Sequence, residues 1–222
     1  MTEFQLDGER TARIGFGEAV YCSGKSPGQI ADILRSVPDT PMLLTRLDTA
    51  RFADLPEDLA ARLDYDPVSR TAWNGQPAPL RPGRHIAVVT AGTSDVPVAR
   101  EVVRTLRFSG HEATEITDVG VAGLWRLLRR VDELRSYPVI IVVAGMDAAL
   151  PSVVAGLLPG VMIGVPTSVG YGVAVGGRAG LDAMLASCAP GLTVMNIDNG
   201  YGAACAALRV LGVMAVMGRA PT

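Results

Sequence analysis

The sequence predicts an α/β protein whose larger domain is a three-layer αβα sandwich around a parallel sheet. From residue 85 onward the chain contains five apolar runs of strand length, and each run ends in a small, polar, glycine-rich turn that leads into a helical segment. The runs at residues 139–143 and 161–165 lack polar alternation, as expected for strands that are covered on both faces. Right-handed crossovers between such strands place helices on both faces of the sheet.

We expect the strands at residues 85–90, 113–117, 139–143, 161–165 and 193–196, with helices between them. The turns that follow are residues 91–95, 118–123, 144–147, 166–172 and 196–202. In an open parallel sheet, ligands bind beyond the carboxyl ends of the strands, where free N–H groups at helix starts attract anions. The five turns therefore predict an active site at one edge of the sheet.

A linker precedes this sheet. Residues 74–83 contain three prolines and two glycines, and they separate a charged amino-terminal third from an apolar remainder. The sequence therefore predicts two domains, at residues 1–80 and 84–222.

The helices and the strand expected in the first domain predict a small α/β cap. Ser26 and Pro27 begin a predicted helix that continues to Val37, because serine is a good helix cap and proline suits the first helical turn. A strand at residues 42–47 and a short helix at residues 55–63 are expected to follow.

Composition restricts the classes of partner. The chain has 222 residues, 49% of them hydrophobic, and a net charge of -2, so it has material for a core but no basic surface for nucleic acid. Three widely spaced cysteines, Cys22, Cys188 and Cys205, are typical of reduced thiols. Residues 1–13 lack the apolar stretch of a signal peptide. We expect a cytoplasmic protein that acts on a small molecule and binds no nucleic acid.

The carboxyl-terminal part is unusually apolar. Residues 200–218 contain one charge, Arg209, near the middle, where a bilayer would disfavour it by about 2.5–3.5 kcal/mol. We therefore expect a buried helix and no membrane partner. Residues 136–222 contain only six charged residues in 87, too few to cover the outside of a monomer. This half is expected to be buried in a homo-oligomer.

Two nucleotide-binding motifs are incomplete. The segment AVYCSGKS satisfies a relaxed phosphate-loop pattern, but the preceding RIGFGE does not predict a strand and Pro27 follows at once. Lys25, the only lysine, is either an anion ligand or an ordinary exposed side chain. Gly200 and Gly202 are followed by Cys205 where a dinucleotide fingerprint needs a small residue, which disfavours a classical hydride-transfer enzyme.

Four residues are candidates for chemistry. Ser94 and Asp95 follow the first strand of the large sheet, where they either cap a helix or bind a ribose hydroxyl. Asp147 is the lone charge in residues 139–161, and because a buried carboxylate without a partner is costly, we expect a function or a cap. Cys188 lies ahead of the last strand, at the sheet edge opposite the turns. It is either a small buried residue or a thiol that a neighbouring subunit brings to the turns.

Several segments together resemble the LarB family, the pyridinium-3,5-biscarboxylic acid mononucleotide synthases that begin nickel-pincer cofactor biosynthesis for lactate racemization. The segments are RIGFGEAVYCSGKS, VVTAGTSDVPVA, VGVAGLWRLL, VVAGMDAALPSVVAGL, VPTSVGYG, SCAPG and NIDNGYGAA, in chain order from residue 13 to residue 204. The second half is also similar to PurE-type aminoimidazole ribonucleotide carboxylases and mutases, which implies a flavodoxin-like, PurE-like sheet and oligomerisation.

The resemblance implies carboxylation of the pyridinium ring of nicotinic acid adenine dinucleotide at C5 by bicarbonate or CO2, with phosphoanhydride hydrolysis that releases AMP. In this family the cysteine of the SCA motif adds to the ring, which assigns that role to Cys188. The acidic residue of the AGM turn removes the C5 proton, which assigns the base to Asp147. The family usually has Glu at this position and His where Trp125 stands.

The residues expected to bind substrate are Thr93, Ser94, Asp95, Arg126, Gly145, Ser168, Asp198 and Asn199. The resemblance implies no tightly bound cofactor, leaves a Mg2+ requirement open, and implies a homo-oligomer built from dimers, for which an octamer is one arrangement. Two alternatives stay open: a PurE-like mutase or carboxylase acting on an imidazole ribonucleotide, and a catalytically silent nucleotide-binding homologue.

Overall fold

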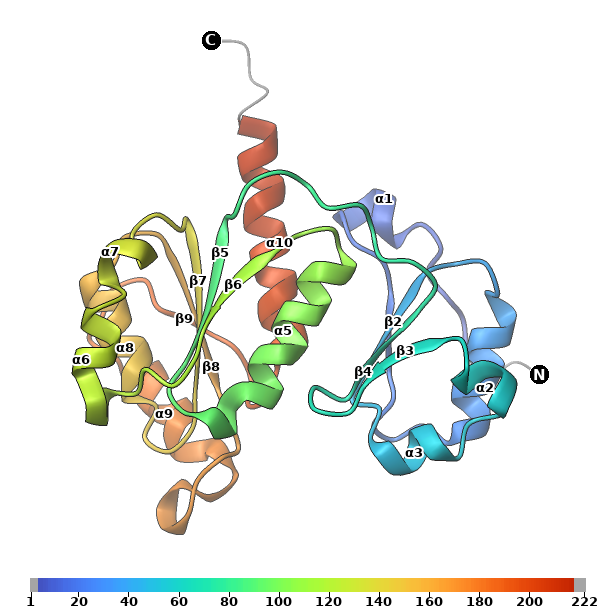
Figure 1. Ribbon diagram of the computed structural model, residues 1–222, viewed down its shortest axis with the longest axis horizontal. Coiled ribbons are helices and arrows are strands. Elements are labelled where there is room, and N and C mark those ends of the chain that lie inside the picture. The colour runs from blue at the N-terminus through green and yellow to red at the C-terminus, as the bar shows by residue number, and fades with distance from the viewer. Residues whose placement is uncertain (1–3, 218–222) are drawn as a thin grey trace.

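A computed structural model describes residues 4–217 and contains two α/β domains side by side (Figure 1). The smaller domain has a four-stranded mixed sheet in the order β1-β2-β4-β3, and the larger has a five-stranded parallel sheet in the order β6-β5-β7-β8-β9. The predicted α/β class and its parallel-sheet domain are confirmed.

The elements of the small domain are short. In chain order they are α1 Arg10–Ile14, β1 Ala19–Tyr21, α2 Pro27–Ser36, β2 Met42–Thr45, α3 Thr49–Ala53, α4 Glu57–Ala60, β3 Leu63–Asp66 and β4 Thr71–Asn74. Helix α2 begins where predicted, because the Ser26 hydroxyl accepts from the Gln29 N–H (3.1 Å) and the Gln29 side chain accepts from the Ser26 N–H (3.0 Å).

The predicted helix at residues 55–63 is wrong in its extent. Helix α4 covers only Glu57–Ala60, and Leu63 already begins β3, which pairs with β4 in antiparallel register. Strand β3 has only four residues, and its strand conformation is set by pairing with β4.

The large domain follows the predicted order of strands and helices. Its elements are β5 Ile86–Thr90, η1 Thr93–Asp95, α5 Val96–Phe108, β6 Ala113–Ile116, η2 Val121–Gly123, α6 Leu124–Leu128, α7 Val131–Leu134, β7 Val139–Ala144, α8 Ala149–Leu157, β8 Val161–Pro166, η3 Gly172–Gly177, α9 Arg178–Leu185, β9 Thr193–Val194 and α10 Gly200–Met217.

Two hydrophobic cores cover the two faces of this sheet. In β7, Ile141 and its alternate neighbours pack with α5 and α10, whereas Ile140 and its alternate neighbours pack with α6 to α9. Each fully buried isoleucine contributes about 1.5–3 kcal/mol relative to an exposed one. The absence of polar alternation in β7 thus follows from helices on both faces (Figure 1).

Helix α10 is long and apolar enough, by length and composition, to cross a membrane. Its first half instead packs against the sheet, where Ala203 and Ala207 are buried in the same core as α5. Its second half projects beyond the sheet (Figure 1), and Val216 there is 71% exposed. The predicted burial is therefore confirmed for the first half only, because the sheet ends before the helix does.

The small domain packs on the outer face of α5. The Arg104 guanidinium lies 4.1 Å from the centre of the Trp73 ring and donates to Thr71 Oγ1 (2.7 Å) and Asp64 Oδ1 (2.9 Å). The connecting segment follows the end of the same helix, where the Ala78 N–H donates to the Phe108 carbonyl (2.9 Å). Helix α5 is thus shared between the two domains.

Candidate functional site

A cavity of about 290 Å³ lies beyond the carboxyl ends of the large sheet. It is lined by the turns after β5, β6 and β7 and by Val169 after β8. The strand order equals 2-1-3-4-5 in this domain's own sequence order, so the connections that follow β5 and β7 run to opposite sides and open a crevice between these two strands. The cavity therefore occupies the position that this topology leaves for a ligand.

Glycine is required where the turns cross. A Cβ atom on Gly145 would lie 2.5 Å from the Val169 carbonyl oxygen and 2.6 Å from Thr167 Oγ1. One on Gly120 would lie 2.7 Å from the Ala91 carbonyl oxygen. The predicted site residue Gly145 thus keeps two turns in contact at the cavity.

Several residues near the cavity have unusual backbone conformations. Left-handed φ values occur at six non-glycine residues of the described chain, and four of them, Asp118, Met146, Ala148 and Asp198, lie in turns at the carboxyl ends of the strands. Such conformations cost about 1–2 kcal/mol each and are concentrated at functional sites.

Asp95 is the buried acid of the site. It is 3% exposed, and its carboxylate accepts from Thr167 Oγ1 (2.7 Å) and from the Gly92 N–H (2.9 Å). Burial raises the pKa of Asp95, and these hydrogen bonds oppose that shift in part. Of its neighbours, Ser94 lines the cavity and is exposed, whereas Thr93 is exposed but does not line it. Asp95 therefore both holds the turn together and borders the cavity.

Arg126 supplies the positive charge of the cavity. Its Nη1 donates to Asp118 Oδ2 (2.5 Å), and its Nε is buried without a hydrogen-bond partner. A buried donor without a partner costs about 1–3 kcal/mol, which an anionic ligand at this position would recover. Trp125 beside it is exposed, lies outside the cavity lining and has the Arg129 guanidinium 4.7 Å from its ring centre.

Asp147 lies at the cavity but is exposed, so the expected burial of this carboxylate is wrong, and its expected function stays a prediction. It caps no helix and has no hydrogen bond or ion pair within the described residues. Its neighbours Met146 and Ala148 have the left-handed conformations noted above. A free carboxylate at the mouth of a cavity is available to accept a proton from a ligand.

A third acid, Asp198, connects the site to the small domain. Its Oδ1 accepts from the Ser168 N–H (2.7 Å), and its main-chain carbonyl accepts from the Arg46 guanidinium. Arg46 Nε also lies 3.6 Å from Oε1 of Glu101, a carboxylate that is 4% exposed. Burial raises the pKa of Glu101, and Arg46 opposes this. Asp198 and Ser168 adjoin the cavity and do not line it.

Asn199 caps α10, since its Oδ1 accepts from the Gly202 N–H (2.8 Å). This contact is sufficient to explain the residue. No group of three His, Cys, Asp or Glu side chains suited to a metal ion occurs within residues 4–217.

Cys188 is exposed and does not line the cavity of its own chain. It lies between α9 and β9, on the approach to the amino end of β9, as the sequence predicts. Burial raises the pKa of Cys22 to about 12 and also raises that of Cys205, so both thiols stay protonated at neutral pH. Of the three cysteines, Cys188 has the greatest access to a ligand.

Sequence reasoning missed three residues of the site: Arg46, Asp118 and Thr167. The polar turns after β6 and β8 contain a signal for Asp118 and Thr167, which lie at strand ends. Arg46 carries no such signal, because its partner Asp198 is 152 residues away in the chain.

A doubly wound parallel sheet with a cavity over its crevice defines the flavodoxin-like class of α/β proteins. Residues 1–76 match the LarB/PurE-like N-terminal domain, and residues 85–217 match the AIR carboxylase family. The chain belongs to the AIR carboxylase (PurE-like) family and has a LarB/PurE-like N-terminal domain in front.

Two relatives come from Methanocaldococcus jannaschii. An uncharacterized protein is 49% identical over 120 residues, which cover 53% of this chain and 46% of that protein. The chain therefore spans about half the length of this relative. The N5-carboxyaminoimidazole ribonucleotide mutase is 33% identical over 135 residues, which cover 58% of this chain and 79% of that protein. A crystal structure of a Treponema denticola PurE2 variant aligns with a TM-score of 0.45 and 17% identity, over 62% of this chain and 94% of that one.

Proposed function

We propose that this protein is a LarB-type carboxylating enzyme. It adds CO2, supplied as such or from bicarbonate, to C5 of the pyridinium ring of nicotinic acid adenine dinucleotide, and water cleaves the phosphoanhydride to release AMP. The product is pyridinium-3,5-biscarboxylic acid mononucleotide. The observation that carries the proposal is the combination, in one chain, of the LarB/PurE-like N-terminal domain with an AIR carboxylase domain.

The chemistry requires a nucleophile and a base. A pyridinium carbon is electron-poor and does not attack CO2, but addition of the Cys188 thiolate to the ring gives a dihydropyridine whose enamine carbon does. That carbon forms the new C–C bond, and the electron pair of the enamine leaves an iminium in the ring. Asp147 then takes the C5 proton and restores the enamine, and expulsion of the thiolate returns the aromatic cation. The thiolate is regenerated, and the net change is replacement of a proton by a carboxylate.

The site is composed from two copies of the chain in this proposal. Cys188 lies at the sheet edge opposite the cavity of its own subunit, so the thiol must come from a second copy. Exposed apolar side chains in the same half of the chain, including Val173 (97% exposed) and Leu185 (65% exposed), support a homo-oligomer that buries them. Such an oligomer is expected in the cytoplasm.

Substrate binding uses the donors around the cavity. The unpaired Arg126 Nε suits a phosphate oxygen, and exposed Ser94 suits a sugar or phosphate oxygen. Asp95, Gly145, Ser168 and Asp198 shape the turns around them. Thr93 and Asn199 are placed at the edge of this site, the latter as a helix cap.

A second candidate is a mutase acting on an imidazole ribonucleotide, which is favoured by the 33% identity to the N5-carboxyaminoimidazole ribonucleotide mutase. That substrate carries its own electron-rich carbon, so the reaction does not need a thiolate. The two functions therefore differ in their dependence on Cys188.

The test is incorporation of radiolabelled bicarbonate into nicotinic acid adenine dinucleotide, together with AMP release, by the wild type and by Cys188→Ala. We expect both products from the wild type and no label from the variant. Undiminished incorporation by Cys188→Ala contradicts the covalent mechanism. Turnover of the imidazole ribonucleotide by both proteins supports the mutase, and binding of the dinucleotide with neither product supports a silent homologue.

A further inference from the structure

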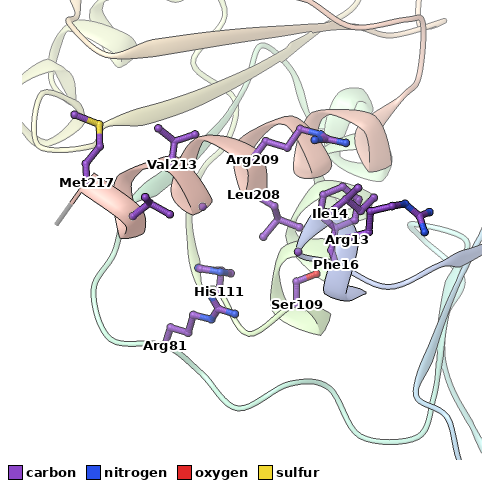
Figure 2. A pocket seen from close by; sticks show the side chains of 13 residues that line it. Arg13, Ile14, Phe16, Arg81, Ser109, His111, Leu208, Arg209, Val213 and Met217 are labelled. Atoms are coloured by element: carbon purple, nitrogen blue, oxygen red, sulfur yellow. The ribbon is translucent and has the colours of Figure 1, made fainter. Parts of the chain in front are cut away.

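A larger cavity, of about 520 Å³, lies away from the candidate active site. It is formed by the second half of α10, by Ser109 and His111 beyond the end of α5, by Arg81 of the connecting segment and by the end of α1 (Figure 2). Helices α5 and α10 both begin at the carboxyl-end turns of the large sheet. The cavity therefore lies toward the opposite, amino-terminal edge of that sheet, and no residue lines both cavities.

The charged groups of this cavity are of one sign. Arg13, Arg81 and Arg209 line it together with the weakly basic His111, and none of the lining residues is acidic. Arg13 pairs with Asp7, and its guanidinium points away from the cavity in Figure 2. Arg81 and Arg209 form no ion pair with any residue in the described part of the chain. Two cations thus stand at the cavity without a counter-charge.

The surroundings of His111 indicate the same excess of positive charge. It lies beside Arg81 in Figure 2. Burial lowers the pKa of His111, and the neighbouring Arg81 and His85 lower it further. Like charges that oppose protonation of a histidine indicate a region of positive potential.

The rest of the cavity wall is apolar. Phe16 and Ile14 lie on the side away from His111, with Leu208 between (Figure 2), and the Arg209 guanidinium is 5.6 Å from the Phe16 ring centre. Val213 and Met217 on α10 are 60% and 72% exposed. An apolar wall beside unpaired arginines matches a ligand with an apolar ring at one end and an anionic group at the other.

We propose that this cavity is a second binding site, separate from the candidate active site, for a small organic anion that carries an apolar ring. The ring contacts Phe16, Ile14 and Leu208, and the anionic group lies toward Arg81 and His111, in a positive field to which Arg209 beside Phe16 also contributes. An apolar surface of another subunit is a poorer occupant, because it would leave both guanidinium groups desolvated without a counter-charge.

A matched pair of fluorescent probes tests this assignment on the full chain. Anilinonaphthalene sulfonate has an aromatic body and an anionic group, whereas phenylnaphthylamine has a similar body without the charge. Arg81→Gln with Arg209→Gln is expected to weaken sulfonate binding about tenfold or more and to change phenylnaphthylamine binding less than about twofold. The paired Lys replacements keep the charge and should retain most of the sulfonate affinity. Arg135→Gln removes an exposed arginine that does not line the cavity and should change neither.

Both arginines are exposed, so the Gln replacements are expected to leave the thermal midpoint nearly unchanged, which circular dichroism checks. Three outcomes overturn the proposal. Sulfonate binding is the same in the Gln variant, or both probes weaken equally, or the assembled wild-type protein has no sulfonate site that depends on these arginines because another subunit seals the cavity.

Discussion

Arg46 of the small domain donates a hydrogen bond to the main-chain carbonyl of Asp198, in the turn that precedes α10 at the candidate active site. The side chain of the same aspartate accepts from the Ser168 N–H (2.7 Å). The small domain is thereby connected to two of the turns around the cavity. It acts as a support for the site and not only as a separate cap.

Replacement of Arg46 by Gln is expected to raise KM for the dinucleotide more than it lowers kcat, because Arg46 positions a turn and does not contact the reacting atoms. It also leaves buried Glu101 without its cation, which should lower the free energy of unfolding by about 1–3 kcal/mol. Steady-state kinetics and urea unfolding measure the two effects. Arg62→Gln, which removes a guanidinium bonded to the Pro38 carbonyl in the same domain, is the control. Equal kinetic effects of the two variants would argue against a positioning role.

Ionisation of Asp95 should lower the free energy of unfolding as pH rises. Because its pKa is raised by burial, the folded chain binds more protons than the unfolded chain between the ordinary aspartate pKa of about 4 and the raised value. The free energy of unfolding contributed by Asp95 therefore decreases as pH rises through that window and stays lower above it. Asp95→Asn cannot ionise and lacks this dependence.

Urea unfolding of the wild type and Asp95→Asn from a pH of about 4 to about 8 tests this sign. The free energy of unfolding of the variant minus that of the wild type should increase with pH. Glu101, whose pKa is also raised, is present in both proteins and cancels in the difference. A difference that is flat or that decreases with pH would refute the assignment.

The order of the strands along the chain and the sheet edge at which the cavity lies could be predicted from the sequence. The apolar runs of β7 and β8 indicate strands that are covered on both faces. The short strands β1 and β3 do not follow from the sequence, since their conformation depends on pairing with β2 and β4. The exposure of Asp147 was also missed. Left-handed backbone at both of its neighbours, Met146 and Ala148, has no signal in residue type.

Gly145→Ala should destabilise the protein by roughly 1–3 kcal/mol, because the added Cβ would overlap the Val169 carbonyl oxygen and Thr167 Oγ1. Gly156→Ala in α8 is the matched control, since nothing lies within 4 Å of its added Cβ, and it should stabilise by about 0.5–1 kcal/mol. Thermal unfolding of both variants gives the comparison. Similar midpoints would mean that the turns at the cavity can move apart freely.

Asp147→Glu is expected to increase the rate of label incorporation, because the LarB-type synthases that this chain resembles usually have glutamate here and one methylene moves the carboxylate by more than about an ångström. A gain of about tenfold, up to a hundredfold, is the expected range. Asp147→Asn, which has the size of the native residue without its basicity, should remove incorporation. Retained incorporation in the Asn variant would exclude Asp147 as the base.

The most direct test of the two-subunit site mixes two inactive proteins, Cys188→Ala and Asp147→Asn, after dissociation and reassembly. In hybrid dimers, one of the two sites receives an intact thiol from one copy and an intact carboxylate from the other. Random reassembly should therefore restore about a quarter of the wild-type incorporation of labelled bicarbonate. Mixed oligomers that form but incorporate no label would contradict a site in which Cys188 of one subunit and Asp147 of another act on the same substrate.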